Sequence, residues 1–387
     1  MALICASILA IGATTAGIYA YWKQQEESLL RNKAEAVLDD IATNLIPVWA
    51  DDEQSPDYKH LSEWSRLPNT GNGFTISPAV IAMLIVSNEF APTALDGKIV
   101  VALRGCSFAP PQFLHERPSL ELFGTRPDHA HPDAVVIVYD MVNSVLSGFD
   151  GSSVPSSEAL QQTVIPEIHT AIGLPVEHSA RCNLLPTGLF HYRVGSHNGR
   201  PGVLVQYQQI AVRRTYTNLT YEVKDPWDVT YVFDDLYPSS AAFYSYGSLT
   251  ISEGDGQNHA PWASFRAALG LTGEGQEEDG KRVDVLLVTG LDAEIAAEFL
   301  NARFGSPQER SEDRDRYLVR LRQGSRGEHV KKLQAALRLP QTGEFDGMTA
   351  KGLADLQTTK LGWSDGIYSP EMDQQLGLCV YERPDCR

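Results

Sequence analysis

The sequence is short of basic residues relative to acidic ones. Its 387 residues include 32 lysines and arginines against 49 aspartates and glutamates, which gives a formal net charge of −17. No basic stretch offsets this charge, because Lys331-Lys332 and Arg213-Arg214 are isolated pairs. Sequence-independent binding of nucleic acid requires many basic contacts to phosphates. DNA and RNA are therefore excluded as main partners.

Five cysteines leave the disulfide pattern open. In an oxidising compartment, Cys379 and Cys386 would close a small loop in the tail, and Cys106 and Cys182 would bridge the middle of the chain. Buried thiols are the alternative, above all for Cys106 and Cys182. Cys5 lies in the apolar N-terminal run and takes no part in this prediction.

Residues 1 to 22 lack any charged side chain. A run of about 20 apolar residues is the length that crosses a hydrocarbon core as a helix. Tyr19, Tyr21 and Trp22 cluster at its end, as an interfacial aromatic belt would. We predict a transmembrane anchor that contacts the membrane through residues 2 to 22. A cleaved signal peptide is the alternative, although a basic n-region is missing.

Residues 23 to 50 carry apolar side chains at helical spacing between charged ones, which predicts an amphipathic stalk. Such a stripe favours self-association, so we expect a homo-oligomer or a larger envelope-spanning assembly. Lys23, Arg31 and Lys33 follow the apolar run. The positive-inside rule alone would therefore place the body of the protein in the cytoplasm.

Residues 51 to 303 have the pattern of a central α+β domain rich in strands. Helical periodicity covers Phe74 to Glu89 and Ala293 to Phe304. Strand patterns cover Lys98 to Arg104, Ala134 to Tyr139, Val203 to Val212, Leu219 to Val223 and Val283 to Val288. Residues 304 to 320 are a run of mixed charge, which predicts a solvated linker.

One histidine pair raises the question of a metal. His129 and His131 are two residues apart and are flanked by aspartates, so in a strand both imidazoles would point to one face. A zinc site needs three or four ligands, and no third ligand is spaced nearby. We expect a polar loop rather than a metal site here, and no cofactor elsewhere.

Residues 321 to 378 show the clearest pattern in the chain. Apolar residues at helical spacing follow Gly324 to Gly327, and Pro340 and Gly343 end that helix. A turn through Asp346 leads into a second helical stretch. A similar turn through Asp365 leads into a third, so the segment contains a short internal repeat and three small helices.

This segment resembles the three-helix peptidoglycan-binding domain. The resemblance rests on Gly324-Ser325-Arg326-Gly327, Val330, Leu333-Gln334 and Leu337, and then on Gly343, Phe345-Asp346-Gly347, Thr349, Leu353 and Leu356-Gln357. It implies binding of peptidoglycan. Groove and turn residues are the expected contacts, and we name Arg326, Phe345, Asp346, Thr349, Asp365 and Tyr368 as the candidates.

A second resemblance lies in the central region. Leu-Pro-Thr-Gly at residues 185 to 188 leads into an alternating strand and resembles the Thr-Pro-Thr-Gly entry of L,D-transpeptidases, β-rich enzymes that cross-link peptidoglycan with a cysteine. Segments between Asp128 and Arg266 resemble bacterial and phage cell-wall proteins that also carry peptidoglycan-binding domains. Those relatives have a histidine and a cysteine where this chain has Tyr237 and Ser248.

The two replacements argue against transpeptidase chemistry. A cysteine nucleophile acts as a thiolate that a nearby histidine activates, and a serine requires a base beside it. We therefore interpret the central domain as catalytically silent. The alternative is an active hydrolase or transpeptidase that uses Ser248 or the carboxylates of Asp234 and Asp235, with a base supplied from elsewhere by His191, His197 or His259.

These observations predict a multi-domain α+β protein. It would comprise an N-terminal transmembrane helix and stalk, a β-rich mixed central domain, a small all-α C-terminal domain of three helices, and a tail over residues 379 to 387. The predicted function is a membrane-anchored peptidoglycan-binding protein that tethers a membrane, or an envelope or virion assembly, to the cell wall. Its body would lie outside the cytoplasmic membrane, on the periplasmic or cell-wall side, or the protein would sit in the membrane of a virion.

Overall fold

The structure is a computed structural model that describes residues 23–25, 28–29, 32, 73–108, 114–125, 134–156, 159, 182–197, 199–217, 223–224, 227–230, 235–239, 245–253, 260–273, 276–301 and 317–381. Within these ranges, no helix is long and apolar enough to cross a membrane. The transmembrane helix of the expected fold class is therefore not supported, and residues 1 to 22, where it was expected, lie outside the described residues. Of the expected stalk, residues 23–25, 28–29 and 32 are helical and exposed.

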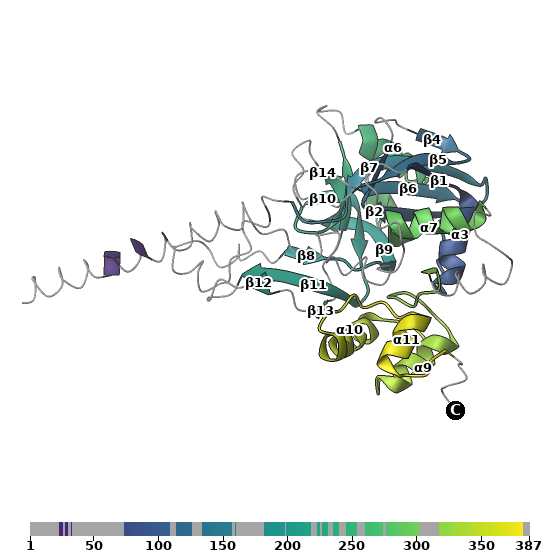
Figure 1. The fold of residues 1–387 in the computed structure, drawn as a ribbon. Coiled ribbons are helices and arrows are strands. Elements are labelled where there is room, and N and C mark those ends of the chain that lie inside the picture. The colour runs from purple at the N-terminus through teal and green to yellow at the C-terminus, as the bar shows by residue number, and fades with distance from the viewer. Residues whose placement is uncertain are drawn as a thin grey trace, which may run out of the picture.

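Eight strands form a closed barrel (Figure 1). The ring closes where β15 (Leu249–Ser252) pairs with β7 (Val145–Ser152). The order around the ring is β15 (Leu249–Ser252), β14 (Asp235–Ser239), β10 (Arg200–Gln206), β9 (Gly188–His197), β16 (Arg282–Thr289), β2 (Lys98–Arg104), β6 (Ala134–Asp140) and β7 (Val145–Ser152). Strand β4 (Leu114–Arg117) pairs with β7 outside the ring.

Alternation of side chains along the strands divides the apolar residues between two cores. The inner core takes at least one residue from each ring strand, among them Val100, Val136, Phe149, Phe190, Leu204, Leu236, Leu249 and Val285. Trp262 and Phe265 of α6 (Ala260–Ala268) also belong to it. The outer core lies between the barrel and a layer formed by α3 (Pro78–Ser87), α7 (Gly290–Leu300) and the sheet β1 (Gly73–Ile76), β5 (Leu120–Gly124), β3 (Cys106–Phe108).

The sequence patterns located the buried strands β2, β6 and β16, but two other predictions were wrong. The helix expected from Phe74 begins only at Pro78, because the Ser77 side chain accepts a hydrogen bond from the backbone N–H of Val80 and caps the helix there. The preceding residues pair with β5 as β1. The single strand expected over residues 203 to 212 is broken, since β10 ends at Gln206 and β11 (Ile210–Thr217) belongs to another sheet.

That second sheet connects the barrel to the C-terminal helices. Its strands are β11, β12 (Val223–Lys224), β13 (Trp227–Thr230) and β8 (Cys182–Leu184). The helices α9 (Glu328–Ala336), α10 (Gly347–Leu361) and α11 (Pro370–Leu376) lie beside it in Figure 1. Each helix occupies the stretch that its apolar periodicity predicted.

The prediction of a separate all-α C-terminal domain was nevertheless wrong. Ala211 of β11 and Trp227 of β13 belong to the same buried cluster as the apolar residues of the three helices. The indole N–H of Trp227 donates to Ser364 Oγ at 2.9 Å. A Cβ added to Gly347 would lie 2.8 Å from the backbone nitrogen of Ala211, so the helix backbone touches the strand. Three short helices have apolar surface left to bury, and the second sheet buries it.

The segment before α9 is packed against the barrel as well. Residues 304 to 316 of the expected linker lie outside the described residues, but Leu318 and Arg320 are buried. The backbone N–H of Leu189 in β9 donates to the carbonyl of Gln323 at 2.8 Å. The side-chain carbonyl of Gln323 accepts from the N–H of Ala211 at 2.9 Å. One residue therefore bonds both the barrel and the second sheet.

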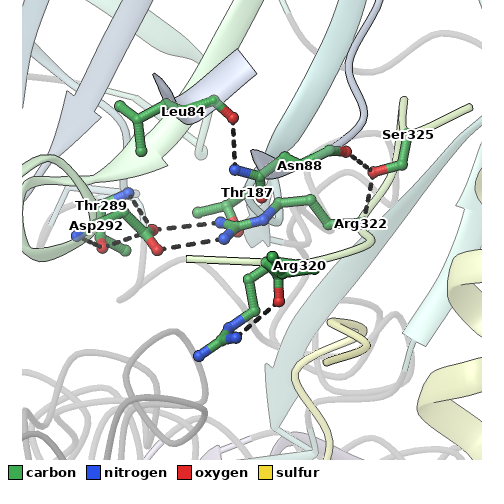
Figure 2. Close-up of polar contacts among 9 residues, drawn as sticks. Leu84, Asn88, Thr187, Thr289, Asp292, Arg320, Arg322 and Ser325 are labelled. Atoms are coloured by element: carbon green, nitrogen blue, oxygen red, sulfur yellow. Dashed lines mark hydrogen bonds and ion pairs between the residues drawn. The ribbon is translucent and has the colours of Figure 1, made fainter. Parts of the chain in front are cut away.

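A buried ion pair lies at the centre of this junction (Figure 2). Arg322 contacts both carboxylate oxygens of Asp292 at 3.2 and 3.3 Å, and it donates to Thr187 Oγ1 at 2.9 Å. The side chains of Arg322 and Asp292 are 1% and 4% exposed. The same carboxylate accepts from the hydroxyl and N–H of Thr289, which forms the capping box of α7. One aspartate thus starts the helix and binds the C-terminal segment.

Further hydrogen bonds complete the junction in Figure 2. The hydroxyl of Ser325 donates to the Asn88 carbonyl at 2.5 Å and accepts from the Arg322 N–H at 3.0 Å. The Asn88 amide in turn donates to the Leu84 carbonyl of α3 at 2.7 Å. Burial, and then the neighbouring Arg322, lower the pKa of Arg320 to about 10, so this guanidinium stays charged at neutral pH.

We expect Arg322→Ala to destabilise the whole protein. Removing one partner of a buried pair leaves the other charge uncompensated, which typically costs about 3–5 kcal/mol of unfolding free energy. Lys351→Ala is the matched control, because Lys351 pairs with Asp355 at 2.6 Å on the exposed surface of α10 and such pairs contribute about 1 kcal/mol or less. Urea unfolding measures both variants, and equal losses would contradict the assigned role of Arg322.

Candidate functional site

The two replaced positions of the transpeptidase-like region lie on neighbouring strands. Tyr237 of β14 is the register partner of Thr250 in β15, and Ser248 immediately precedes β15. The Ser248 carbonyl accepts from Ser245 Oγ at 3.0 Å. Among the side chains that the structure describes, no histidine is hydrogen-bonded to Ser248. His259 and the side chain of His197 lie outside that set.

Ser245, rather than Ser248, is the centre of the local hydrogen bonding. Its backbone N–H and carbonyl both bond to Ser156, and its hydroxyl accepts from the N–H of Gly247 at 3.0 Å. Gly247 has φ of 122°, and a Cβ there would lie 1.6 Å from the Asn183 carbonyl oxygen. The Asn183 N–H of β8 also donates to the Tyr246 carbonyl at 2.8 Å, so these bonds hold the turn before β15 against Ser156 and β8 and are structural.

Five of the six predicted peptidoglycan-binding residues have structural roles. Phe345 and Tyr368 are fully buried, and the Tyr368 hydroxyl donates to Asp373. The carboxylate of Asp346 caps α10 by accepting from the N–H and hydroxyl of Thr349 at 2.8 and 2.7 Å. Asp365 is 2% exposed and accepts from Gln357 at 2.7 Å and from the Ile367 N–H at 2.9 Å.

Arg326 is the exception, because its side chain is 43% exposed. The guanidinium donates to a carboxylate oxygen of Glu344 at 3.0 Å, and Glu344 is 45% exposed. The same Arg326 Nη2 lies 3.4 Å from His191 Nε2, although the residues are 135 positions apart. The structure thus joins a residue of the C-terminal pattern to a residue of the Leu-Pro-Thr-Gly strand.

His191 is held by a buried aspartate. Its Nδ1 lies 2.6 Å from Asp284 Oδ1, and the second oxygen of Asp284 accepts from the Thr93 N–H at 2.6 Å. The Asp284 side chain is 2% exposed and that of His191 is 16% exposed. Because a guanidinium donor faces Nε2, the network assigns the proton to Nδ1. The free Nε2 lone pair is then directed toward Arg326, at the surface.

Tyr207 lies beside this pair, in the break between β10 and β11. Its ring stacks on His191 with centroids 6.4 Å apart and 30° between the planes. Burial raises the pKa of the Tyr207 phenol, and Arg282 and Arg193 only partly oppose this effect. The hydroxyl is therefore protonated at neutral pH and able to donate a hydrogen bond. The sequence-based prediction did not include Tyr207, because residues 203 to 212 were interpreted as one strand.

These contacts define a candidate binding surface, made of Arg326, Glu344, His191 and Tyr207. It spans the C-terminal segment and the barrel strand β9, and Asp284 supports it from below. Its chemistry is that of polar recognition. The Arg326 guanidinium, backed by Glu344, is a donor, the Glu344 carboxylate and His191 Nε2 are acceptors, and Tyr207 adds an aromatic ring. A nucleophile with a bonded base is not found among the described members of this surface.

The remaining residues predicted from the sequence are the four disulfide cysteines and the histidine pair. The Cys106 thiol is buried and donates to the Leu103 carbonyl at 3.3 Å, so the bridge to Cys182 does not form. Cys379 is disulfide-bonded, whereas its expected partner Cys386 lies outside the described residues. His129 and His131 also lie outside them. The described residues contain no cluster of three or more potential metal ligands.

Comparison with known proteins gives no match to a family model, to a curated protein or to a solved structure. The resemblances to the peptidoglycan-binding domain and to the transpeptidases therefore stay as expectations.

Glu278 fixes the turn that precedes β16 and so supports the strand of Asp284. Its carboxylate bonds Arg266 at 2.6 Å, Lys281 at 3.3 Å and the Thr272 N–H at 3.0 Å. Burial alone would raise the pKa of Glu278, but hydrogen bonds from the Gly273 backbone, Arg266 and Lys281 outweigh burial and hold the pKa below its ordinary value. The ionised carboxylate therefore stabilises the folded protein.

We expect Glu278→Gln to lower the unfolding free energy at pH 7 by about 1.5–3 kcal/mol, the usual contribution of hydrogen bonds to a charged group. A lowered folded-state pKa means that this stability is present above the unfolded value near 4.3 and is lost as the pH falls through the folded value. Urea unfolding from pH 7 to pH 3 should show the variant and the parent converge. Glu277→Gln, at an exposed neighbouring position, is the control and should have little effect.

Proposed function

We propose that this protein binds peptidoglycan through its C-terminal segment, residues 321 to 378, and that the contact surface includes Arg326 and Glu344. The sequence resemblance of this segment supports the proposal. So do the three helices, which begin and end where the pattern expects them. Peptidoglycan lies outside the cytoplasmic membrane, so the proposal assigns this segment to the same compartment.

The observation that carries the proposal is the exposure of Arg326, since four of the other five candidates are buried and Asp346 is half-buried as the cap of α10. A guanidinium presents a planar fork of donors that suits carboxylates and amide or hydroxyl oxygens. The stem peptides and sugars of peptidoglycan carry these groups. Glu344 orients the Arg326 fork and offers an acceptor beside it. A hydrogen-bond donor on Arg326 beside an acceptor on Glu344 suits a ligand that carries acceptors and donors of its own.

The proposal assigns binding and not turnover. Ser248 has no histidine bonded to it in the part of the chain that the structure describes, and His191 is bonded to Asp284 and faces Arg326. His191 belongs to β9, whereas Ser248 precedes β15 on a different part of the ring. The barrel accordingly acts as the support on which the binding segment is mounted.

Co-sedimentation of the full-length chain with purified sacculi tests the proposal. We expect the protein to pellet with sacculi, to remain in solution without them, and to release no muropeptides. Loss of a charge-assisted hydrogen bond weakens binding by about 1.5 kcal/mol or more, so Arg326→Ala should reduce affinity at least about tenfold.

Lys351→Ala is the control for charge and exposure and should bind like the parent. Urea unfolding would establish that Arg326→Ala is folded. A chain that stays in solution with sacculi present would refute the proposed function. Undiminished binding by Arg326→Ala would refute the proposed surface, and release of muropeptides would refute the restriction to binding.

A further inference from the structure

Two arginines face one another beside the candidate binding surface. Arg193 of β9 and Arg282 of β16 are register partners, two residues along each strand from the pair His191 and Asp284. Tyr192 and Val283 belong to the inner core, so these four side chains alternate to the outer face of the barrel. Arg193 and Arg282 are both exposed.

The ring of Tyr207 lies close to both guanidinium groups. The Cζ atoms of Arg193 and Arg282 are 5.9 and 5.5 Å from its centroid. These are cation–π distances, and His191 stacks on the same ring. The tyrosine therefore holds the two cations near each other and near His191. We call Tyr207, Arg193 and Arg282 the Tyr207 patch.

The charges of the Tyr207 patch are not neutralised by the described part of the chain. Like charges directly opposite each other on neighbouring strands destabilise a sheet. Neither Arg193 nor Arg282 forms an ion pair with a described carboxylate. The nearest one in register, Asp284, is committed to His191 and to the Thr93 N–H. In a chain of net charge −17, an adjacent pair of arginines that no described carboxylate neutralises is a local exception.

We propose that the Tyr207 patch binds a carboxylate of the peptidoglycan stem peptide. Two guanidinium forks are able to clamp one carboxylate, and the Tyr207 hydroxyl is a third donor beside them. This inference rests on the proposed function, because it names the group that the extended surface recognises. His191 lies between the Tyr207 patch and Arg326. One ligand would therefore contact both the barrel and the C-terminal segment.

The test uses the full-length chain and three soluble probes. These are a disaccharide-tetrapeptide muropeptide with free stem carboxylates, the same muropeptide with those carboxylates amidated, and inorganic phosphate. Isothermal titration calorimetry should show the free form binding at least about tenfold more tightly than the amidated form, as expected for charge-assisted hydrogen bonds. Phosphate shares the oxyanion chemistry and should compete only weakly.

The double variant Arg193→Gln with Arg282→Gln should remove the preference for the free carboxylate. Arg117→Gln, an exposed arginine on β4, is the matched control and should keep it. Equal binding of both muropeptides, or a preference that survives the double variant, would overturn the inference. Phosphate binding as tight as that of the muropeptide would also overturn it, in favour of a general oxyanion site.

The outcomes separate this inference from the proposed function. If the parent chain binds sacculi and Arg326→Ala weakens that binding, but amidation has no effect, only the Tyr207 patch assignment fails. If the parent chain binds neither sacculi nor either muropeptide, the proposed function fails and this inference fails with it.

Discussion

The architecture depends on one buried ion pair, between Arg322 of the C-terminal segment and Asp292 of α7. Taking both charges out of water is costly, and the cost is recovered only when the geometry is good and the remaining lone pairs are occupied. Here both carboxylate oxygens contact the guanidinium, and Thr289 and Thr187 supply the additional hydrogen bonds. Because Asp292 also caps α7, the start of that helix and the attachment of the C-terminal segment depend on the same carboxylate.

This pair explains why the candidate surface exists. Arg326 follows Arg322 by four residues, and between them Gln323 and Ser325 bond the barrel, the second sheet and the residues after α3. With the backbone fixed at these points, Arg326 emerges beside His191 and Glu344. The surface is therefore a product of the junction, and neither the barrel nor the helices would form it alone.

The sequence predicted what depends on local periodicity. Strand β2 and helices α9, α10 and α11 could be located because their apolar residues repeat at the spacing of the element. The closed ring could not be predicted, since it depends on pairings such as that of Thr250 with Ser152, almost one hundred residues apart. The prediction that the C-terminal helices form a domain of their own was wrong. Trp227 and Ala211 complete the core of these helices, and both lie more than one hundred residues upstream.

The candidate site was predictable only in part. Arg326 was named from a motif, and His191 was named as a base for a reaction that its contacts do not support. Glu344 and Tyr207 were missed because nothing in their sequence neighbourhood distinguishes them, and Asp284 was missed although its neighbourhood does. Asp284 is one polar residue in an apolar strand, and this was the available signal: a buried carboxylate needs a partner, and here the partner is His191.

The break at Tyr207 separates two sheets, and Gln323 bonds a strand of each. The chain leaves the barrel there and enters β11, against which the helices pack, while the segment around Gln323 returns from the helices to β9. The helices are consequently fastened to the barrel at two places, and they do not hang from one flexible tether. A ligand that touches both parts would meet groups already at fixed separation, and little freedom between them would be lost when it binds.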